Sequence, residues 1–325
     1  MERIKKNLEL KPLFLERIKL LLPDENDLEG YLKILKVEPV RSIRCNKLKI
    51  SPEKLKENLE KKGWKISQPF KEYPEVMIVE NNLSPGELGR SLEHLLGYYY
   101  VQELASMLPI ICLAPGDKET ILDLCASPGS KTTQIAAELE NRGLIIANEP
   151  QMDRLRILAS NLERCGVTNT IITRKDGRSI CKDLKEANIE FDKILVDAPC
   201  SGEGTLRSSP KTYLMWNIKT IQNLPKIQER LFSEAFETLK VGGELVYSTC
   251  THAPEENEGV VNDMLEKFGE RIKIEKVNIP LKKVRPGLTE WQGKKYSKEV
   301  KNCARIYPHD NNTEGFFISK FRRVK

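Results

Sequence analysis

From about residue 117 onward, segments typical of buried strands alternate with segments of helical periodicity. We expect strands at residues 121–125, 144–149, 170–176, 193–198, 244–249, 271–277 and 316–321. We expect helices at residues 131–141, 152–165, 218–239 and 254–268. Repeated strand–helix units build a mostly parallel sheet with helices on both faces. The pattern therefore predicts an α/β fold with a Rossmann-like, doubly wound sheet. Within it, Pro225 is expected to interrupt the third helix, because proline lacks a backbone N–H.

The first 95 residues have a different pattern. Apolar positions at helical spacing indicate helices up to about residue 37, and residues 40–46 have the composition of a strand. Ser51 and Pro52 have the positions of a helix cap and a first turn, and this short helix is expected to end at Gly63. Residues 64–66 and 76–79 are expected to form further strands. We therefore predict a smaller α+β module over residues 1–95, followed by the larger α/β domain over residues 96–325.

Bulk properties exclude several classes of protein. The chain of 325 residues has no apolar run long enough to span a membrane, and Met1–Lys6 lacks the features of a secretion signal. Its eight cysteines include no CxxC pair, and it has three histidines. We therefore expect no metal site, reduced thiols and a cytoplasmic location, and we take a monomer as the default state.

Basic charge is clustered along the chain. Arg41–Lys65 has nine basic and three acidic residues, and Lys282–Arg305 has eight basic and two acidic ones. Such clusters are typical of a surface that binds a phosphate-rich partner such as RNA. A solvated lysine-rich surface explains the same count equally well.

The turn after the first predicted strand of the larger domain matches neither a phosphate loop nor a GxGxxG fingerprint. Acids follow successive strands instead, with Glu149 placed to accept from ribose hydroxyls and Asp176 from an adenine amino group. A nucleoside site without a phosphate cradle is suited to S-adenosylmethionine. The competing interpretation is that Asp123, Glu149 and Asp176 only cap helices.

Two cysteines each follow a predicted buried strand. Cys200 ends the segment that contains Asp197, and Cys250 ends the segment before the next helix. Strand ends border the ligand crevice of an open α/β sheet, so two thiols there indicate covalent chemistry, with one attacking and the other assisting. Methyl transfer to cytosine carbon 5 needs such an attack at carbon 6, and Asp197 could bind the pyrimidine edge. These considerations leave the roles of the two thiols interchangeable.

Several longer motifs occur in a fixed order. They are the segments Val101–Met107, Cys125–Thr132, Asp197–Gly202, Tyr247–Thr251, Pro254–Glu258 and Gly315–Phe317. In these motifs the chain resembles the Nop/Sun-type RNA cytosine-carbon-5 methyltransferases. The resemblance implies a class I methyltransferase domain with S-adenosylmethionine as cofactor, tRNA or rRNA as substrate, and an N-terminal RNA-binding lobe.

The resemblance also implies roles for individual residues. Cys250, in the Thr-Cys motif, is implied as the nucleophile, and Cys200, in the Pro-Cys motif, as the thiol that assists proton removal and release. Lys131 is implied to pair with Asp197 near the target base. The positions that resemble the family's cofactor site are Cys125, Ala126, Ser127, Pro128, Gly129, Ser130, Lys131, Glu149, Arg154, Asp176 and Asp197.

Two departures from the family pattern occur in the expected cofactor site. Ser130 replaces a glycine, and Glu149 stands where aspartate is more usual. Two other classes of function stay open beside RNA methylation. One is a non-catalytic RNA-binding or ribosome-assembly factor that retains the fold, and the other is a small-molecule methyltransferase.

Overall fold

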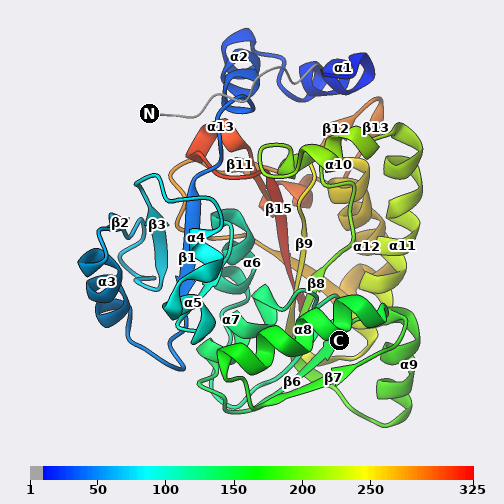
Figure 1. Cartoon of the computed structure of the whole chain (residues 1–325). Coiled ribbons are helices and arrows are strands. Elements are labelled where there is room, and N and C mark those ends of the chain that lie inside the picture. The colour runs from blue at the N-terminus through cyan, green and yellow to red at the C-terminus, as the bar shows by residue number, and fades with distance from the viewer. Residues whose placement is uncertain (1–9) are drawn as a thin grey trace.

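The computed structural model describes residues 10–325, so the segment Met1–Lys6 lies outside the described residues. A large α/β part is built on one central sheet, and a small module lies at its side (Figure 1). The large sheet consists of β5 (Thr120–Asp123), β6 (Leu144–Asn148), β7 (Thr170–Thr173), β8 (Phe191–Asp197), β9 (Leu239–Thr249), β10 (Ile272–Glu275), β11 (Arg285–Pro286), β14 (Ala304–Ile306) and β15 (Phe316–Arg323).

The strand order is β11-β14-β15-β9-β8-β5-β6-β7, with β10 paired to β15. Strands β7, β6, β5, β8 and β9 are parallel neighbours, whereas β15 pairs antiparallel with β9. The chain reverses its direction of progress across the sheet between β5 and β8. Ligands bind outside the carboxyl ends of the strands at such a switch point, so the loops after β5 and β8 are positioned to form a site.

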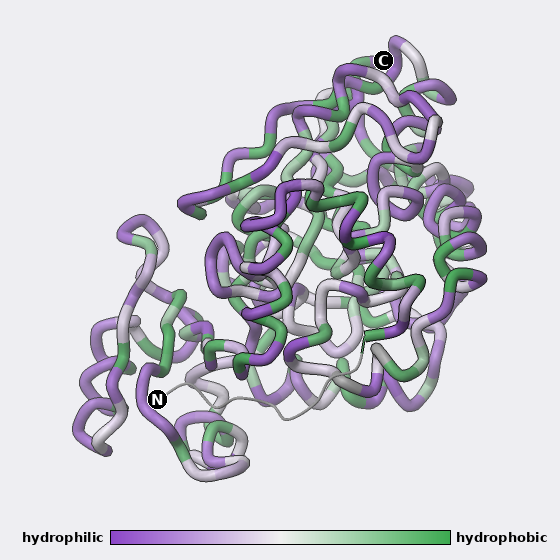
Figure 2. The backbone as a smooth tube through the Cα atoms, turned by 90° about the horizontal axis from the view of Figure 1, so that it is seen from above, coloured by the Kyte–Doolittle hydropathy of each residue, from purple (hydrophilic) through white to green (hydrophobic). Residues whose placement is uncertain are grey.

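Alternating residues of the buried strands face two separate cores. Leu122 and Val196 pack with α9 (Gly177–Glu186), α11 (Ile218–Glu237) and α12 (Val260–Phe268) on one face. Ile121 and Leu195 pack with α6 (Leu104–Leu113) and α7 (Ser130–Glu138) on the other, and α8 (Met152–Cys165) packs against Ala147. Figure 2 shows that hydrophobic residues gather in the middle of the large part and that mostly hydrophilic residues surround them. The predicted doubly wound sheet with helices on both faces is confirmed.

The small module is an antiparallel sheet with its own core. Its order is β2-β3-β1-β4, formed by β1 (Arg41–Cys45), β2 (Ile66–Ser67), β3 (Val76–Val79) and β4 (Tyr99–Val101). Its helices are α3 (Pro52–Lys61), α4 (Glu87–Arg90) and α5 (Leu92–Leu95). Ser51 caps α3 by accepting the Lys54 N–H, as predicted. Because β4 pairs with β1, the small sheet includes residues after 95.

The first two helices pack on the large part. In α1 (Pro12–Leu21) and α2 (Glu25–Ile34), the buried residues Phe14, Ile18 and Tyr31 belong to the core that α11 and α12 share with the large sheet. Phe14 contacts Trp216 edge-on, with ring centroids 5.5 Å apart. From residue 12 onward the chain therefore runs first along the large part, crosses to the small module, and returns (Figure 1).

Some predicted elements need correction. Pro225 lies inside a continuous α11, because the apolar stripe of this 20-residue helix packs over its whole length and outweighs one missing N–H. The strand predicted at residues 244–249 begins earlier, so that Gly242-Gly243 lies within β9. A Cβ atom at Gly243 would lie 2.9 Å from the Asp192 carbonyl oxygen, so glycine allows β8 and β9 to stay paired beside their register shift.

Other elements complete the architecture. Residues 76–79 and 152–165 form β3 and α8 as predicted, whereas α6 and α9 were not predicted. The helix predicted at 254–268 begins with a π-helical turn at Glu255–Gly259 before α12. The remaining elements are α10 (Pro210–Met215), α13 (Pro308–Asn311), the hairpin of β12 (Glu290–Trp291) and β13 (Lys294–Lys295), and short 3-10 turns. Within residues 10–325, every helix is too short or too polar to cross a membrane.

We expect Phe14→Ala to lower the free energy of unfolding by about 3–5 kcal/mol, because the change leaves a cavity against Trp216. Leu20→Ala on the same helix is the matched control, since Leu20 is 60% exposed. Urea denaturation of both variants checks the prediction. Equal, small losses would contradict the packing of α1 on the large part.

Candidate active site

The two thiols meet at the carboxyl ends of neighbouring parallel strands. Asp197 of β8 is in register with Ser248 of β9. Each of these strands is followed by a loop that holds one of the two cysteines. The Sγ atoms of Cys200 and Cys250 lie 3.1 Å apart. The backbone N–H of Cys250 also donates to the Cys200 Sγ at 3.3 Å. The hydrogen bond with Cys250, together with burial, raises the pKa of the Cys200 thiol.

Asp197 and Lys131 form an ion pair at the same edge of the sheet. The Lys131 Nζ lies 2.7 Å from Asp197 Oδ2, and the Ser248 hydroxyl donates to Asp197 Oδ1 at 2.7 Å. Lys131 also donates to the Ser106 hydroxyl at 3.0 Å and lies 5.4 Å from the centre of the Phe316 ring. These contacts hold the carboxylate and the ammonium group in one orientation beside the thiols. Ser106 and Ser248 were not among the predicted site residues.

The turn after β5 is tied to helix α8. The Ser127 hydroxyl donates to the Arg154 carbonyl oxygen at 2.9 Å, and the Arg154 guanidinium donates back to the Ser127 carbonyl oxygen at 3.0 Å. Gly129 has a φ of +99°, and a Cβ atom there would lie 3.1 Å from Leu158 Cδ1. Glycine is therefore required for this turn to approach α8. Ser130, in place of the usual second glycine, begins α7 without strain.

The three predicted acids after the strands have different surroundings. Glu149 is buried, accepts the Gln151 N–H at 2.9 Å, and lies 3.3 Å from Arg154. Asp176 caps α9 and pairs with Arg178 at 2.7 Å, which lowers the pKa of its carboxyl. Asp176 is thus a helix cap, as the competing interpretation had it, and it lines a cavity as well.

Asp123 is buried beneath the turn and accepts the Thr132 hydroxyl at 2.7 Å. Burial raises the pKa of Asp123 to about 7. Among the described residues, its Oδ1 atom has no hydrogen-bond partner. A ligand with a hydrogen-bond donor could therefore satisfy this oxygen.

Two cavities open on the site and share one wall. The first, of about 340 Å³, is lined by Gln102, Lys131, Glu314, Phe316 and other residues. The second, of about 360 Å³, is lined by Glu149, Arg154, Asp176, Cys200 and other residues. The residues common to both are Cys125, Ser127, Asp197, Ala198 and Cys250. A group bound in one cavity would therefore face a group bound in the other across Cys250 and Asp197.

Glu256 supports the loop that holds Cys200, and the sequence analysis missed it. Its Oε2 atom accepts the Ser201 N–H and the Gln228 side-chain amide, each at 2.9 Å, and the same amide donates to the Pro199 carbonyl oxygen at 2.9 Å. Burial raises the pKa of Glu256 to about 7. The only sequence signal is its place in the motif Pro254–Glu258, which is far along the chain from the loop of Cys200 that it supports.

The basic stretches contribute less surface charge than their composition indicates. Arg44 is fully buried and donates to Gln102, to the Thr133 hydroxyl at 2.8 Å and to the Ser130 carbonyl oxygen at 2.7 Å. Arg305 is likewise buried and pairs with Glu258 at 2.6 Å. These two arginines cannot touch RNA phosphates. Arg44 instead joins the small module to the start of α7.

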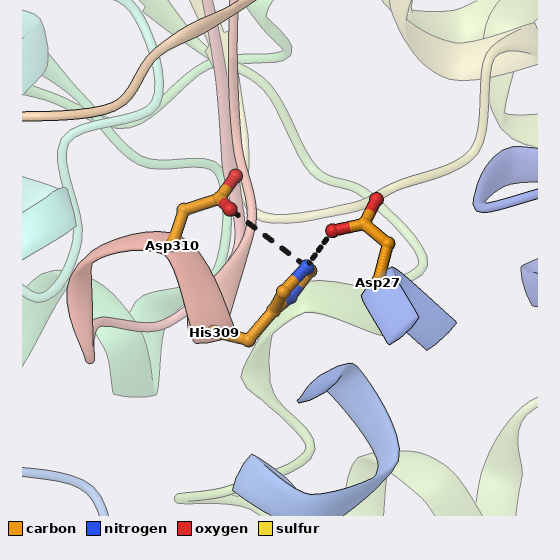
Figure 3. Close-up of side chains that lie close together, drawn as sticks. All are labelled: Asp27, His309 and Asp310. Carbon is orange, nitrogen blue, oxygen red and sulfur yellow. Dashed lines mark hydrogen bonds and ion pairs between the residues drawn. The ribbon is translucent and has the colours of Figure 1, made fainter. Parts of the chain in front are cut away.

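A cluster of Asp27, His309 and Asp310 has the ligand types of a metal site (Figure 3). His309 Nε2 lies 2.8 Å from Asp27 Oδ1 and 3.8 Å from Asp310 Oδ1. Both carboxylates are already paired with Arg285, and Lys283 lies 2.6 Å from Asp310. This charge balance favours an ionic cluster that fastens α2 to α13 over a site for a cation.

The fold is that of the class I methyltransferases. Two solved structures from Pyrococcus horikoshii resemble it. One, a methyltransferase homologue, has a TM-score of 0.78 and 34% identity over 97% of this chain and 100% of its own. The other, NSun6 with SFG, has a TM-score of 0.82 and 29% identity over 97% of this chain and 99% of its own.

Curated relatives agree with this class. Ribosomal RNA small subunit methyltransferase F of Vibrio campbellii (strain ATCC BAA-1116) is 37% identical over 98% of this chain. The chain spans 64% of the length of that protein. The tRNA (cytosine(49)-C(5))-methyltransferase of Pyrococcus abyssi (strain GE5 / Orsay) is 42% identical over 94% of each chain.

Family models match both parts of the chain. The model of the 16S rRNA methyltransferase RsmB/F family matches residues 110–322. The model of the N-terminal domain of 16S rRNA methyltransferase RsmF matches residues 10–104. The chain therefore belongs to the RsmB/F methyltransferase family, which confirms the resemblance to Nop/Sun-type enzymes.

We expect Glu256→Gln to change how stability depends on pH. The pKa of Glu256 is about 7 in the folded protein and near 4.5 when unfolded, so the folded state binds the proton more tightly. The wild type therefore loses stability as the pH rises from about 4.5 through about 7, and the glutamine variant lacks this loss. The unfolding free energy of the variant minus that of the wild type should therefore increase by about 1–3 kcal/mol between pH 5 and pH 8.

Chemical denaturation at both pH values measures this difference. Glu186→Gln on the exposed side of α9 is the control and should show no such increase. A difference for Glu256→Gln that did not vary with pH would contradict the burial of an ionisable carboxyl behind Cys200.

Proposed function

We propose that the chain methylates carbon 5 of a cytosine in RNA, with S-adenosylmethionine as methyl donor. The observation on which this rests is the pair of thiols, 3.1 Å apart, beside the Lys131–Asp197 ion pair where two cavities meet. The names of the relatives agree with it, since one acts on small-subunit rRNA and another on cytosine 49 of tRNA.

The cavity of about 360 Å³ fits the cofactor by its donor and acceptor groups. Glu149 offers an acceptor for ribose hydroxyls, and Asp176 is placed for an adenine amino group, at the ends of successive strands. The turn has no phosphate cradle, and S-adenosylmethionine has no phosphate. SFG, which is bound to the related NSun6, is an analogue of this cofactor. When bound, the cofactor supplies an electrophilic methyl group.

The cavity of about 340 Å³ would hold the target cytosine, which must leave its stack to enter. The Cys250 thiolate adds to carbon 6, and the electron pair of the 5,6 double bond becomes available at carbon 5 for methylation. Asp197, held by Lys131 and Ser248, accepts a hydrogen bond from the pyrimidine edge and orients the ring.

Release needs a proton to leave and a bond to break. The proton on carbon 5 passes to a solvent water molecule, the electron pair of the C–H bond re-forms the double bond, and the carbon 6–sulfur bond breaks so that Cys250 leaves as a thiolate. Cys200, which lies 3.1 Å from the Cys250 sulfur, is placed to assist this step. Glu256 acts as a positioning residue for Cys200 through Ser201 and Gln228.

The activity is tested by incubating the protein with radiolabelled S-adenosylmethionine and separate pools of tRNA and rRNA that lack the modification. We expect label in 5-methylcytosine with one of the two pools, identified by nucleoside analysis. If neither pool takes up label, the proposed activity is wrong, and a non-catalytic RNA-binding factor becomes the better interpretation.

The two cysteines should fail in different ways. Cys250→Ala should lower methylation by roughly 10³-fold or more, because the nucleophile is lost. Cys200→Ala should instead accumulate a covalent protein–RNA adduct, since attack remains and release fails. Denaturing gels with labelled RNA detect the adduct. Cys181→Ala, at a buried thiol of α9, is the control for cysteine loss.

An adduct that formed with Cys250→Ala and not with Cys200→Ala would reverse the two roles. No adduct with either variant, together with full activity of Cys200→Ala, would remove Cys200 from the mechanism.

A further inference from the structure

Glu314 is a buried acid on the wall of the proposed cytosine cavity. Its side chain is 2% exposed and lines the cavity together with Cys250 and Lys131. Neither of its carboxyl oxygens has a hydrogen bond of good geometry within residues 10–325, although the hydroxyl and the backbone N–H of Ser208 are near enough to act on its pKa. Leaving such a group unsatisfied is costly, so this position calls for a hydrogen-bond donor from a ligand.

The backbone around Glu314 is held without the help of its side chain. The Glu314 N–H donates to Glu103 Oε1 at 2.9 Å, and buried Arg207 donates to the Thr313 carbonyl oxygen at 2.8 Å. The Gly315 N–H donates to the Gly204 carbonyl oxygen at 2.9 Å. These bonds fix the segment even if the carboxyl is replaced. The carboxyl of Glu314 is therefore not needed to form the loop.

The same network connects Glu314 to the loop of the proposed nucleophile. The Gly204 N–H donates to the Cys250 carbonyl oxygen at 2.9 Å, so Gly204 lies between Gly315 and Cys250. A Cβ atom at Gly204 would lie 2.2 Å from the Gly315 carbonyl oxygen. This close approach sets the position of Glu314 relative to Cys250.

The orientation of a cytidine in the cavity follows from the proposed function. Carbon 5 must face the cofactor cavity and carbon 6 must face Cys250. The exocyclic amino group is next to carbon 5, and it therefore lies near Asp197, which lines both cavities. Glu314 lines the first cavity and is linked through Gly204 to the loop of Cys250. Because carbon 6, which Cys250 attacks, is next to the ring nitrogen that carries the ribose, we place Glu314 on the ribose side of the nucleotide.

Only one hydrogen-bond donor is available on that side of a nucleotide within an RNA strand. The 3′ and 5′ oxygens are esterified, and carbonyl oxygen 2 is an acceptor. The ribose 2′-hydroxyl is the remaining donor, and it is the group that distinguishes RNA from DNA. Burial and the neighbouring Glu103 raise the pKa of Glu314 to about 7, and its carboxyl accepts a hydrogen bond in either protonation state.

We propose that Glu314 accepts a hydrogen bond from the 2′-hydroxyl of the target cytidine and so selects RNA over DNA at that nucleotide. The proposal rests on the proposed function, because it uses the orientation that attack by Cys250 requires. In this proposal Glu314 determines the specificity for RNA. It lies directly before the motif Gly315–Phe317 and is not part of it.

The test compares two RNAs that differ at one atom. Both RNAs have the sequence around the position at which the methylation assay finds 5-methylcytosine. One RNA has cytidine at that position, and the other has 2′-deoxycytidine. We expect kcat/KM of the wild type to fall roughly 10- to 100-fold on the deoxy substrate, the range for loss of one hydrogen bond to a charged group.

Variants of Glu314 should lose this preference. Glu314→Met removes the acceptor while keeping a long buried side chain, so it should lose activity on the all-ribose RNA and show a ribose-to-deoxyribose ratio near one. Glu314→Gln keeps a neutral carbonyl acceptor and should have an intermediate ratio. Glu190→Met, at an exposed position, is the control and should keep the wild-type ratio.

Each outcome decides one question. Equal methylation of both RNAs by the wild type would overturn the proposal without any variant. A full wild-type ratio in either folded Glu314 variant would also overturn it, because the carboxyl would not contact the 2′-hydroxyl. No methylation of the all-ribose RNA by the wild type would contradict the proposed function itself, which separates the two failures.

Discussion

The parallel pairing of β8 with β9 is the constraint on which the site depends. Because Asp197 and Ser248 are in register, the loops after both strands begin at the same edge of the sheet. One loop presents Cys200 and the other Cys250, so the thiols touch without further adjustment. The same register places the Ser248 hydroxyl against Asp197, which then faces Lys131 from the start of α7. A shift of register between β8 and β9 would move Cys250 and Ser248 away from Cys200 and Asp197.

The fold could be predicted wherever local pattern and tertiary packing agree. Residues 152–165 have a strong helical periodicity and a glycine at the end, and they form α8 to the residue. Pro225 and Gly242-Gly243 are strong local signals, yet long-range packing overrides them in α11 and β9. Helix α6 was missed because it is apolar on every side and contains Pro109, so it has almost no periodicity to detect.

The residues of the site that follow predicted strands, or the turn after one, could be predicted from the sequence. Cys200, Cys250, Asp197 and Lys131 were all expected near one another, and the structure brings them together. The count of basic residues wrongly placed Arg44 on the surface. Arg44 is buried because it binds Gln102 and Thr133, which are far away in the sequence. Glu256 and Glu314 were missed for the same reason, since burial that raises a carboxyl pKa arises only from the folded packing.

The ionic cluster of Asp27, Arg285 and Asp310 has a consequence for synthesis of the chain. Asp27 and Arg285 are separated by 258 residues, and β15 inserts between β14 and β9 only after residue 316 has been made. A ribosome adds about 5–20 residues per second, so α1 and α2 wait tens of seconds for the surface they cover. During that interval the apolar faces of both helices are open to solvent or to a chaperone, while the small module, whose sheet is complete at residue 101, can already fold.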